Sequence, residues 1–186
     1  MNFVLFGIQG SGKGTQAKII SEKFHLTIIE AGEALRHLAQ EKSELGEKVK
    51  GIVESGNLVP APILVEIIEN FLSKLPADQP VLFDGFPRNF EQKVLFDEMM
   101  TKHHRDFTAI NINLPQEETI KRLLSRARHD DVPEIMTKRI RIFIQDTTPI
   151  IEQYRIQNKV IDINGYQTIE EVSREIISKT EHYFLK

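Results

Sequence analysis

A glycine-rich segment, GIQGSGKGTQ from Gly7 to Gln16, lies between an apolar run and a pattern of helical period. Backbone N–H groups in such a loop can surround phosphate oxygens, often with the positive φ angles that glycine permits. The following helix directs its positive end to the same place, and Lys13 adds a full charge beside the terminal phosphates of a nucleotide. The spacing is typical of a P-loop, and the alternative is a glycine-rich turn that binds nothing. Gly14 occupies the usual Ser/Thr position after the lysine, so a magnesium contact is expected through Thr15 or through water.

A second group of polar residues lies in the segment PVLFDGFPRNFEQ. Its apolar run delivers Asp84 to the carboxyl end of a predicted strand, where open α/β sheets bind their ligands. A carboxylate there can orient the water shell of a magnesium ion, although Asp84 could also simply cap a helix. The turn from Gly85 to Pro87 then presents Arg88.

A third group is basic. Arg122 and Arg126 are four residues apart on one face of a predicted helix, where like charges repel unless an anion lies against them. Arg128 follows, and Arg139 and Arg141 come from the next helix. From residue 121 to residue 141 there are seven Lys/Arg and three Asp/Glu, a local charge of +4 in a chain of net charge −3. A solvated basic face is the alternative to an anion site.

The composition sets wider limits. A chain of 186 residues fits one domain, and the absence of cysteine excludes disulfides and thiolate metal sites. The net charge of −3 gives no overall attraction to nucleic acid or to acidic membranes. Neither a signal sequence nor a membrane-spanning apolar run is recognisable, so a cytoplasmic protein is expected. A monomer is expected because no apolar stripe is left over for a partner.

The elements that must position these residues alternate between short apolar runs and longer segments of helical period, the pattern of a mainly parallel α/β sheet. The predicted strands are Asn2–Phe6, Leu26–Glu30, Pro80–Asp84, Ala109–Asn113 and Lys159–Ile163. The predicted helices are Lys13–Phe24, Gly32–Lys42, Ser43–Ser55, Ala61–Leu75, Phe90–His103, Gln116–Arg126, Pro133–Asn158 and Thr168–His182. Part of the stretch from Gly32 to Leu75 is expected to stand off the sheet as a small lobe, and Pro149 is expected to kink or break its helix.

Four motifs together resemble the nucleoside monophosphate kinases, most closely the adenylate kinases: GIQGSGKGTQ, GNLVP, DGFPR followed by Gln92, and TTPIIEQY. The resemblance covers nearly the whole chain. It implies a single P-loop domain over 1–186, a three-layer α/β/α fold with a five-stranded parallel sheet. It also implies a small helical insertion for the monophosphate at about 30–59 and a short lid at about 126–132.

The resemblance also implies roles. The donor ATP would contact Gly10, Ser11, Gly12, Lys13, Gly14, Thr15, Arg122, Arg126, Gly165 and Gln167. The acceptor AMP would contact Ala31, Arg36, Asn57, Leu58, Val59, Gly85, Phe86, Pro87, Arg88, Gln92, Arg128 and Arg139. Catalysis would fall to Lys13, Arg88, Arg126, Arg128 and Arg139. Magnesium would be held by Asp84 through a bound water and by Thr15, and the short-lid form implies no zinc.

The acceptor base is less firmly indicated. The amide of Gln92 suits the adenine edge, because it can donate and accept together. Against this, Ala31 and Asn89 resemble the pyrimidine-specific relatives, and Glu30 replaces the usual serine. AMP is favoured because Gln92 would touch the base directly, with a UMP/CMP kinase as the alternative. A P-loop switch resembling small GTPases is disfavoured, since NKVI at 158–161 lacks the aspartate of the guanine signature, and an inactive homologue retained for interaction is disfavoured by its complete set of phosphate-contacting residues.

Overall fold

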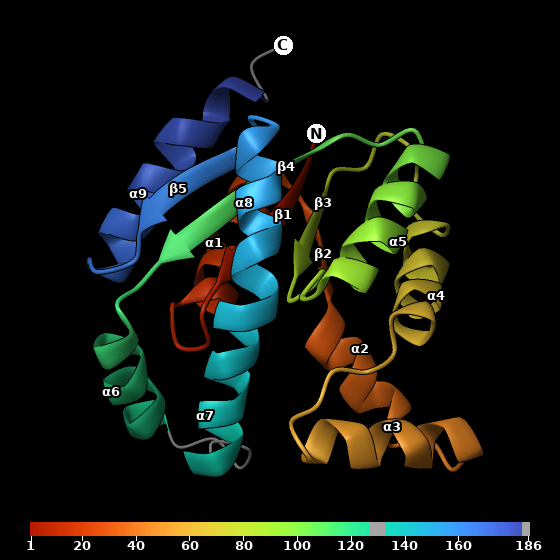
Figure 1. The fold of residues 1–186 in the computed structure, drawn as a ribbon. Helices are drawn as coiled ribbons and strands as arrows, with labels where there is room; N and C mark the ends of the chain where they lie inside the picture. Colours follow the sequence, from red (N-terminus) through yellow and green to blue (C-terminus); the bar gives the residue numbers. More distant parts are fainter. Residues whose placement is uncertain (127–132, 184–186) are drawn as a thin grey trace.

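The computed structural model describes residues 1–126 and 133–183, and within these ranges five parallel strands form one sheet in the order β2-β3-β1-β4-β5 (Figure 1). The strands are β1 (Asn2–Gly7), β2 (Thr27–Glu30), β3 (Val81–Asp84), β4 (Phe107–Asn113) and β5 (Val160–Asn164). Each lies within two residues of its predicted bounds. The prediction of a parallel α/β sheet is therefore confirmed.

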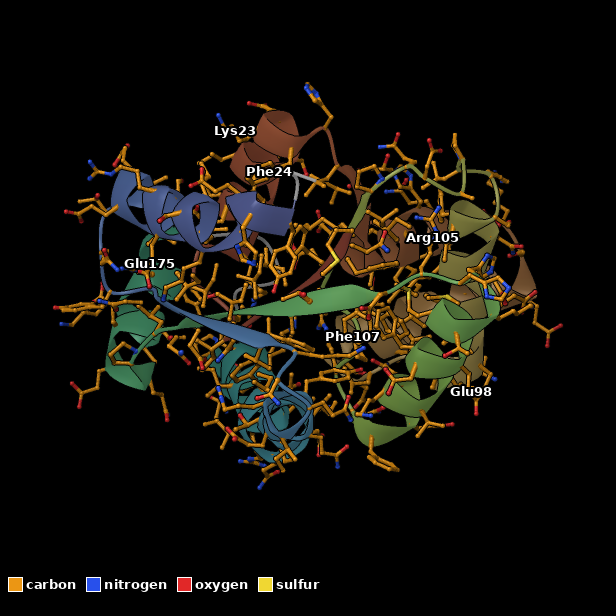
Figure 2. The ribbon with its side chains drawn as sticks, turned by 90° about the horizontal axis from the view of Figure 1, so that it is seen from above. Lys23, Phe24, Glu98, Arg105, Phe107 and Glu175 are labelled. Atoms are coloured by element: carbon orange, nitrogen blue, oxygen red, sulfur yellow. The ribbon has the colours of Figure 1, made fainter. Side chains whose placement is uncertain are left out.

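Helices cover both faces of the sheet. They are α1 (Lys13–Phe24), α2 (Ala31–Leu38), α3 (Glu44–Glu54), α4 (Ala61–Leu72), α5 (Phe90–Lys102), α6 (Gln116–Arg126), α7 (Pro133–Ile142), α8 (Thr148–Ile156) and α9 (Ile169–Thr180), with a terminal 3₁₀ turn η2 (Glu181–Tyr183). Seen from above, α1 and α9 lie on one side of the sheet and α5 and α8 on the other (Figure 2). The predicted three-layer arrangement is present.

Alternation along the central strand explains the two layers of core. Phe3 and Leu5 of β1 point to the side of α1 and α9, whereas Val4 and Phe6 point to the side of α4, α5 and α8. All four side chains are at most 3% exposed. On the second side, Phe107 of β4 packs with its ring 5.2 Å from that of Tyr154 (Figure 2). Both sides of the strand are thus buried, as a parallel sheet requires.

The helices α2 and α3 extend beyond the carboxyl ends of the strands (Figure 1). Helix α2 contacts β2 and α4, and α3 packs on α2. The first of these helices ends four residues before its predicted end, because Ser43 starts α3 by accepting a hydrogen bond on Oγ from the Gly46 N–H at 3.0 Å. Across from them, Lys138 Nζ of α7 donates to Ser55 O at 2.9 Å. The chain therefore encloses the carboxyl edge of the sheet from two sides.

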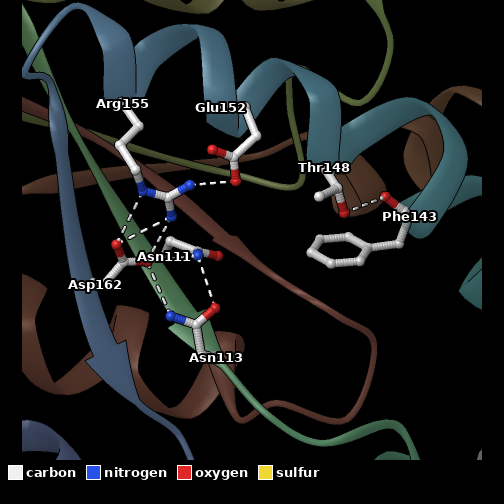
Figure 3. A network of polar contacts seen from close by, with 7 residues as sticks. All are labelled: Asn111, Asn113, Phe143, Thr148, Glu152, Arg155 and Asp162. Atoms are coloured by element: carbon white, nitrogen blue, oxygen red, sulfur yellow. Dashed lines mark hydrogen bonds and ion pairs between the residues drawn. The ribbon is translucent and has the colours of Figure 1, made fainter.

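The helix interruption predicted at Pro149 takes the form of a π-helical turn, η1 (Phe143–Thr147). The backbone N–H of Thr148 donates to Phe143 O, five residues back, and the Thr148 hydroxyl donates to the same oxygen at 3.1 Å (Figure 3). Proline lacks an N–H group, so the ordinary α-helical ladder cannot pass through this position. The chain stays helical but widens for one turn before α8.

A polar network fastens α8 to the edge strand β5 and its neighbour β4 (Figure 3). Asp162 of β5 accepts hydrogen bonds from Arg155 Nη2 at 2.9 Å and from the side-chain amides of Asn111 and Asn113, both also at 2.9 Å. Arg155 is further bound to Glu152 one turn earlier in the helix. The three bonds to Asp162 named above end on Oδ1, and Oδ2 accepts from Arg155 Nε at 3.2 Å and Nη2 at 3.0 Å, so both carboxylate oxygens hold the edge of the sheet against the helix.

In the part of the chain that the structure describes, no helix has both the length and the apolar character needed to cross a membrane.

Candidate active site

The carboxyl ends of the strands meet at one edge of the sheet, below the strands in Figure 1. β1 leads into the glycine-rich loop, β2 ends at Glu30 and β3 ends at Asp84. In the register of the sheet, Asp84 is paired with Leu5 on one side and with Glu30 on the other. The topology therefore places the loop and both carboxylates next to one another.

The loop between β1 and α1 turns sharply at Gly12, which has φ 92° and stands directly before the first residue of α1. Any other residue would occupy this left-handed region at a cost of about 1–2 kcal/mol, which explains the glycine. Lys13 Nζ donates to Gly7 O, and to Ile8 O at 3.2 Å. The lysine thus lies across the loop, with its charge held at the end of β1.

A pocket of about 340 Å³ opens beside this loop, toward α6 and the start of α9. Among the residues predicted to bind the donor, it is lined by Gly10, Ser11, Gly12, Thr15, Arg122 and Gln167. It is also lined by Gln16, Thr168, Ile169 and Val172, which the sequence did not indicate. The last three lie at the start of α9, far from the loop in sequence. The capping box of Thr168 with Glu171 marks the start of a helix and gives no sign of a pocket.

The other donor-side residues are held by neighbouring side chains and backbone. Arg122 Nε donates to Glu118 Oε1 at 3.1 Å, one turn earlier in α6. Gln167 Nε2 donates to Glu175 Oε2 at 2.8 Å. The N–H of Gly165 donates to Asn113 O at 2.7 Å, which draws the chain after β5 against the end of β4. Gly165 therefore supports the wall of the pocket and does not line it, whereas Gly14 is exposed at the start of α1.

Asp84 is 7% exposed at the end of β3. Burial raises the pKa of its carboxyl group, and the nearby charge of Glu30 adds to this effect, while Lys13 and Arg88 oppose it. The carboxylate thus lies within the electrostatic reach of both predicted phosphate-binding cations. The competing reading of Asp84 as a helix cap is not supported, because Asn89 caps the helix that follows it.

Arg88 is anchored at three points. Its backbone N–H donates to Gln92 Oε1 at 2.8 Å, its carbonyl accepts from the Thr147 hydroxyl at 2.8 Å, and its Nε donates to Gly85 O at 2.7 Å. The first two bonds fix the backbone of Arg88, and the bond from Nε orients its guanidinium group before any ligand arrives.

Several charges surround this arginine. Burial lowers the pKa of the Arg88 guanidinium, Arg139 and Arg36 act in the same direction, and Asp84 and Glu30 oppose them. Three predicted acceptor-phosphate ligands, from α2, α7 and the loop after β3, therefore share one electrostatic environment. Cations that share one environment repel one another, and an anion bound among them would stabilise the arrangement.

The turn before α5 holds the residues predicted to meet the acceptor. Phe86 is 1% exposed, and the peptide bond that joins it to Pro87 is cis. Gln92 is also 1% exposed, and its Oε1 already accepts the Arg88 N–H. An amide oxygen has a second lone pair, so a contact with a base would have to share this oxygen or use Nε2. Asn89 Oδ1 accepts the Gln92 N–H at 2.8 Å, which gives Asn89 a helix-capping reason to be present.

The remaining acceptor residues lie in the stretch from β2 to α4. Ala31, 2% exposed, packs into the core, and Val59 is 3% exposed. Leu58 is half-buried, and Asn57 is exposed with its Nδ2 donating to Ser55 Oγ at 2.8 Å. Arg36 is exposed on α2 and pairs with Glu30. Ala31 and Arg36 thus belong to α2, and Asn57 to Val59 lie in the connection between α3 and α4.

Two predicted residues cannot be placed. The side chain of Arg126 and the whole of Arg128 lie outside the described residues, as does the predicted lid beyond residue 126.

Comparison with known proteins agrees with this geometry. The family model described as adenylate kinase matches residues 5–159. The chain is 36% identical over 174 residues to "Adenylate kinase 1" of a Nostoc species, covering 93% of this chain and 95% of that protein. It is 34% identical over 181 residues to an adenylate kinase of Bacteroides fragilis, covering 95% and 96%, and 32% identical over 186 residues to an adenylate kinase of Phocaeicola vulgatus, covering 97% and 98%.

Proposed function

The chain belongs to the adenylate kinase family, and from that premise we propose that it transfers a phosphoryl group reversibly from ATP to AMP, giving two ADP. Membership makes it a phosphotransferase of the nucleoside monophosphate kinase class. The proposal adds the donor, the acceptor and the residues that hold each of them. The observation that carries it is the anchored Arg88, with Arg36 and Arg139 within its electrostatic reach, beside a P-loop pocket.

The physical task is to bring two polyanions together end to end. Two unit charges about 4 Å apart repel by about 4 kcal/mol at an effective dielectric near 20, and several such pairs form between the nucleotides. Lys13 from the loop and the arginines from three other segments supply opposing positive charge. Because these groups are already oriented, they stabilise most strongly the charge that spreads over the phosphoryl group in flight.

The acceptor needs no general base. A nucleotide monophosphate has a second pKa of about 6, so its oxygen is mostly ionised at neutral pH and can attack directly. In this proposal the residues of the site position the two nucleotides and neutralise their charge. No side chain of the site takes up or releases a proton. Arg126 and Arg128 would join this set from the lid at about 126–132, and the small lobe at about 30–59 would carry Arg36 and Asn57 to Val59 onto the acceptor.

The oxygen donors present fit a magnesium ion. Asp84 offers a buried carboxylate at a strand end, and Thr15 offers an exposed hydroxyl at the first turn of α1. Magnesium is commonly held by one or two such groups together with waters and substrate phosphates, so Asp84 would act through a bound water. Within residues 1–126 and 133–183 no cluster of three or more His, Cys, Asp or Glu side chains could hold a metal by itself. When bound, the ion would neutralise charge on the donor phosphates. The absence of zinc stays a prediction.

AMP is proposed over UMP and CMP. The capping role of Asn89 removes one of the features that pointed to a pyrimidine acceptor, whereas buried Gln92 stays within one turn of the phosphate-binding Arg88. A coupled assay of ADP formation with AMP, UMP and CMP at fixed ATP tests this directly. AMP should give the highest kcat/KM, and a higher value with CMP or UMP would replace AMP as acceptor.

We also propose that the chain acts as a monomer in the cytoplasm, without nucleic-acid or membrane partners. The net charge of −3 supports the last part, because it gives no overall attraction to nucleic acid or acidic membranes. Light scattering at assay concentrations, with and without ATP and AMP, would show a mass near 21.4 kDa.

A further inference from the structure

Glu30 stands at a position where its residue type does not help the helix that follows. It ends β2 and precedes Ala31, the first residue of α2, with φ −92° and ψ 106°. Ser, Thr, Asp and Asn are preferred there, because their short side chains can accept a hydrogen bond from the first turn. Among the described residues, Glu30 makes no such bond to the helix. Glu30 therefore does not serve α2 as a hydrogen-bonding cap.

The carboxylate of Glu30 is instead paired with Arg36. Arg36 Nη2 lies 3.0 Å from Glu30 Oε1, and the two side chains are 54% and 38% exposed. The pair crosses the first turn of α2 above Gly32, where an added Cβ would lie 3.3 Å from Arg36 Nη1 and 3.7 Å from Glu30 Oε1. The glutamate thus holds one of the cations assigned to the acceptor phosphate.

The charge of Glu30 also acts on two other residues near the proposed acceptor site, Asp84 and Arg88. Glu30 is the register partner of Asp84 in the sheet, and its charge adds to the raised pKa of that carboxyl group. It also partly offsets the lowered pKa of Arg88. Two carboxylates and the cations Lys13, Arg36 and Arg88 thus lie in one neighbourhood, where an incoming phosphate meets repulsion as well as attraction.

We propose that Glu30 competes with the acceptor phosphate for Arg36 and so weakens acceptor binding. The proposal rests on the proposed function, because Arg36 is taken as a phosphate ligand. Without a nucleotide, the Glu30 carboxylate is paired with the Arg36 guanidinium group. To bind Arg36, the monophosphate must displace this carboxylate, and both groups are negatively charged. Glu30 acts through Arg36, so it is a positioning residue that sets the KM for the acceptor.

The test replaces Glu30 by glutamine, which keeps the size and removes the charge. Glu30→Gln should lower the KM for AMP about 2- to 5-fold, the upper part of the range for an exposed ion pair. The KM for ATP and kcat should change less than about twofold, since the removed interaction opposes ground-state and transition-state binding alike. Glu33→Gln is the matched control, because Glu33 lies on the same helix and pairs with His37 at 3.8 Å, away from Arg36.

Two further measurements separate this role from a structural one. Calorimetric titration with adenosine, which lacks the phosphate, should give the same affinity for parent and Glu30→Gln. In an Arg36→Gln background, Glu30→Gln should change the KM for AMP less than about twofold, because the group it competes for is gone. Glu30→Ser, a second variant with a better capping residue, should follow Glu30→Gln.

An unchanged or higher KM for AMP in Glu30→Gln, or an equal gain in adenosine affinity, would overturn the competition. Failure of the proposed function would look different, because the parent itself would then form no ADP from ATP and AMP. In that case direct titration of parent and variant with AMP, CMP and UMP still measures the competition, since it acts on the phosphate that all three share.

Discussion

Replacing Gly85 by alanine perturbs the acceptor site through geometry alone. Gly85 has φ 80°, and an added Cβ would lie 2.8 Å from Arg88 Nη2. Ordinary contact begins at 3.4 Å, so the guanidinium group must move by about 0.6 Å or the backbone must shift. Either movement strains the Arg88 Nε bond to Gly85 O, which is 2.7 Å long in the parent.

Two magnitudes follow from this clash. A non-glycine residue at such a φ costs about 1–2 kcal/mol, which for a chain of this length lowers Tm by about 2–8 °C. Misplacement of a phosphate-positioning group by about 1 Å can cost about 100-fold in rate, so a movement of roughly half that should lower kcat/KM for AMP by about 10-fold or more. The KM for ATP should stay within about twofold, because no residue of the turn at Gly85 lines the pocket proposed for the donor.

Steady-state kinetics with each substrate varied in turn, beside a thermal melt, measures both effects. Gly51→Ala is the matched control: Gly51 lies inside α3, and among the described residues an added Cβ meets nothing within 4 Å. Alanine there should raise stability by about 0.5–1 kcal/mol and leave both KM values unchanged. If Gly85→Ala lowered Tm but kept kcat/KM for AMP at the parent value, the anchored Arg88 would not be the group that holds the acceptor.

Three further outcomes are expected. Lys13→Ala should lower kcat at least about 10²–10³-fold, as loss of one transition-state donor does, and a variant within tenfold of the parent would remove the lysine from the mechanism. Arg88→Ala should raise the KM for AMP with little change for ATP, and an equal rise in both would count against the assignment. Burial raises the pKa of the Asp162 carboxyl, but hydrogen bonds from Arg155 and two asparagines outweigh it and hold that pKa below its ordinary value. The contribution of Asp162 to stability is therefore present above about pH 4 and is lost as the pH falls through the lowered pKa. Asp162→Asn should lower Tm at pH 7 and flatten the decrease of Tm at acid pH. If Tm decreased at acid pH as in the parent, the network would not link stability to pH.

The sheet and the loop could be predicted because their signals are local. Continuous apolar runs identify buried parallel strands, and glycine at fixed spacing before a lysine identifies the loop, since both depend on residues close in sequence. Prediction was weaker where the reason for a residue is tertiary. Thr168 and Ile169 line the donor pocket only because α9 packs beside α1, and no local pattern announces that.

Glu30 and Asn89 were noticed in the sequence, but the structural reason for each was not predicted. Both were visible as departures from the family pattern, and sequence alone set them beside base specificity. In the structure Asn89 caps α5 and Glu30 holds Arg36, so neither residue is explained by the base. A departure from a motif shows that a position differs from the family. The role of the new side chain depends on the atoms that it contacts, which the sequence does not give.

The turn around Arg88 gives a physical reason why distant motifs occur together. Its N–H is held by Gln92 of the segment DGFPRNFEQ, and its carbonyl is held by Thr147, the first residue of TTPIIEQY, 59 positions later. Directly beyond Thr147, the π-helical turn gives way to α8, whose Tyr154 is fully buried and donates to Asp97 of α5 at 2.8 Å. The turn before α5 is therefore tied to η1 through Arg88, and α5 itself is tied to α8 through Tyr154. We therefore expect Arg88, proposed to bind the acceptor phosphate, to keep its backbone position against neighbouring positive charges through contacts from both motifs.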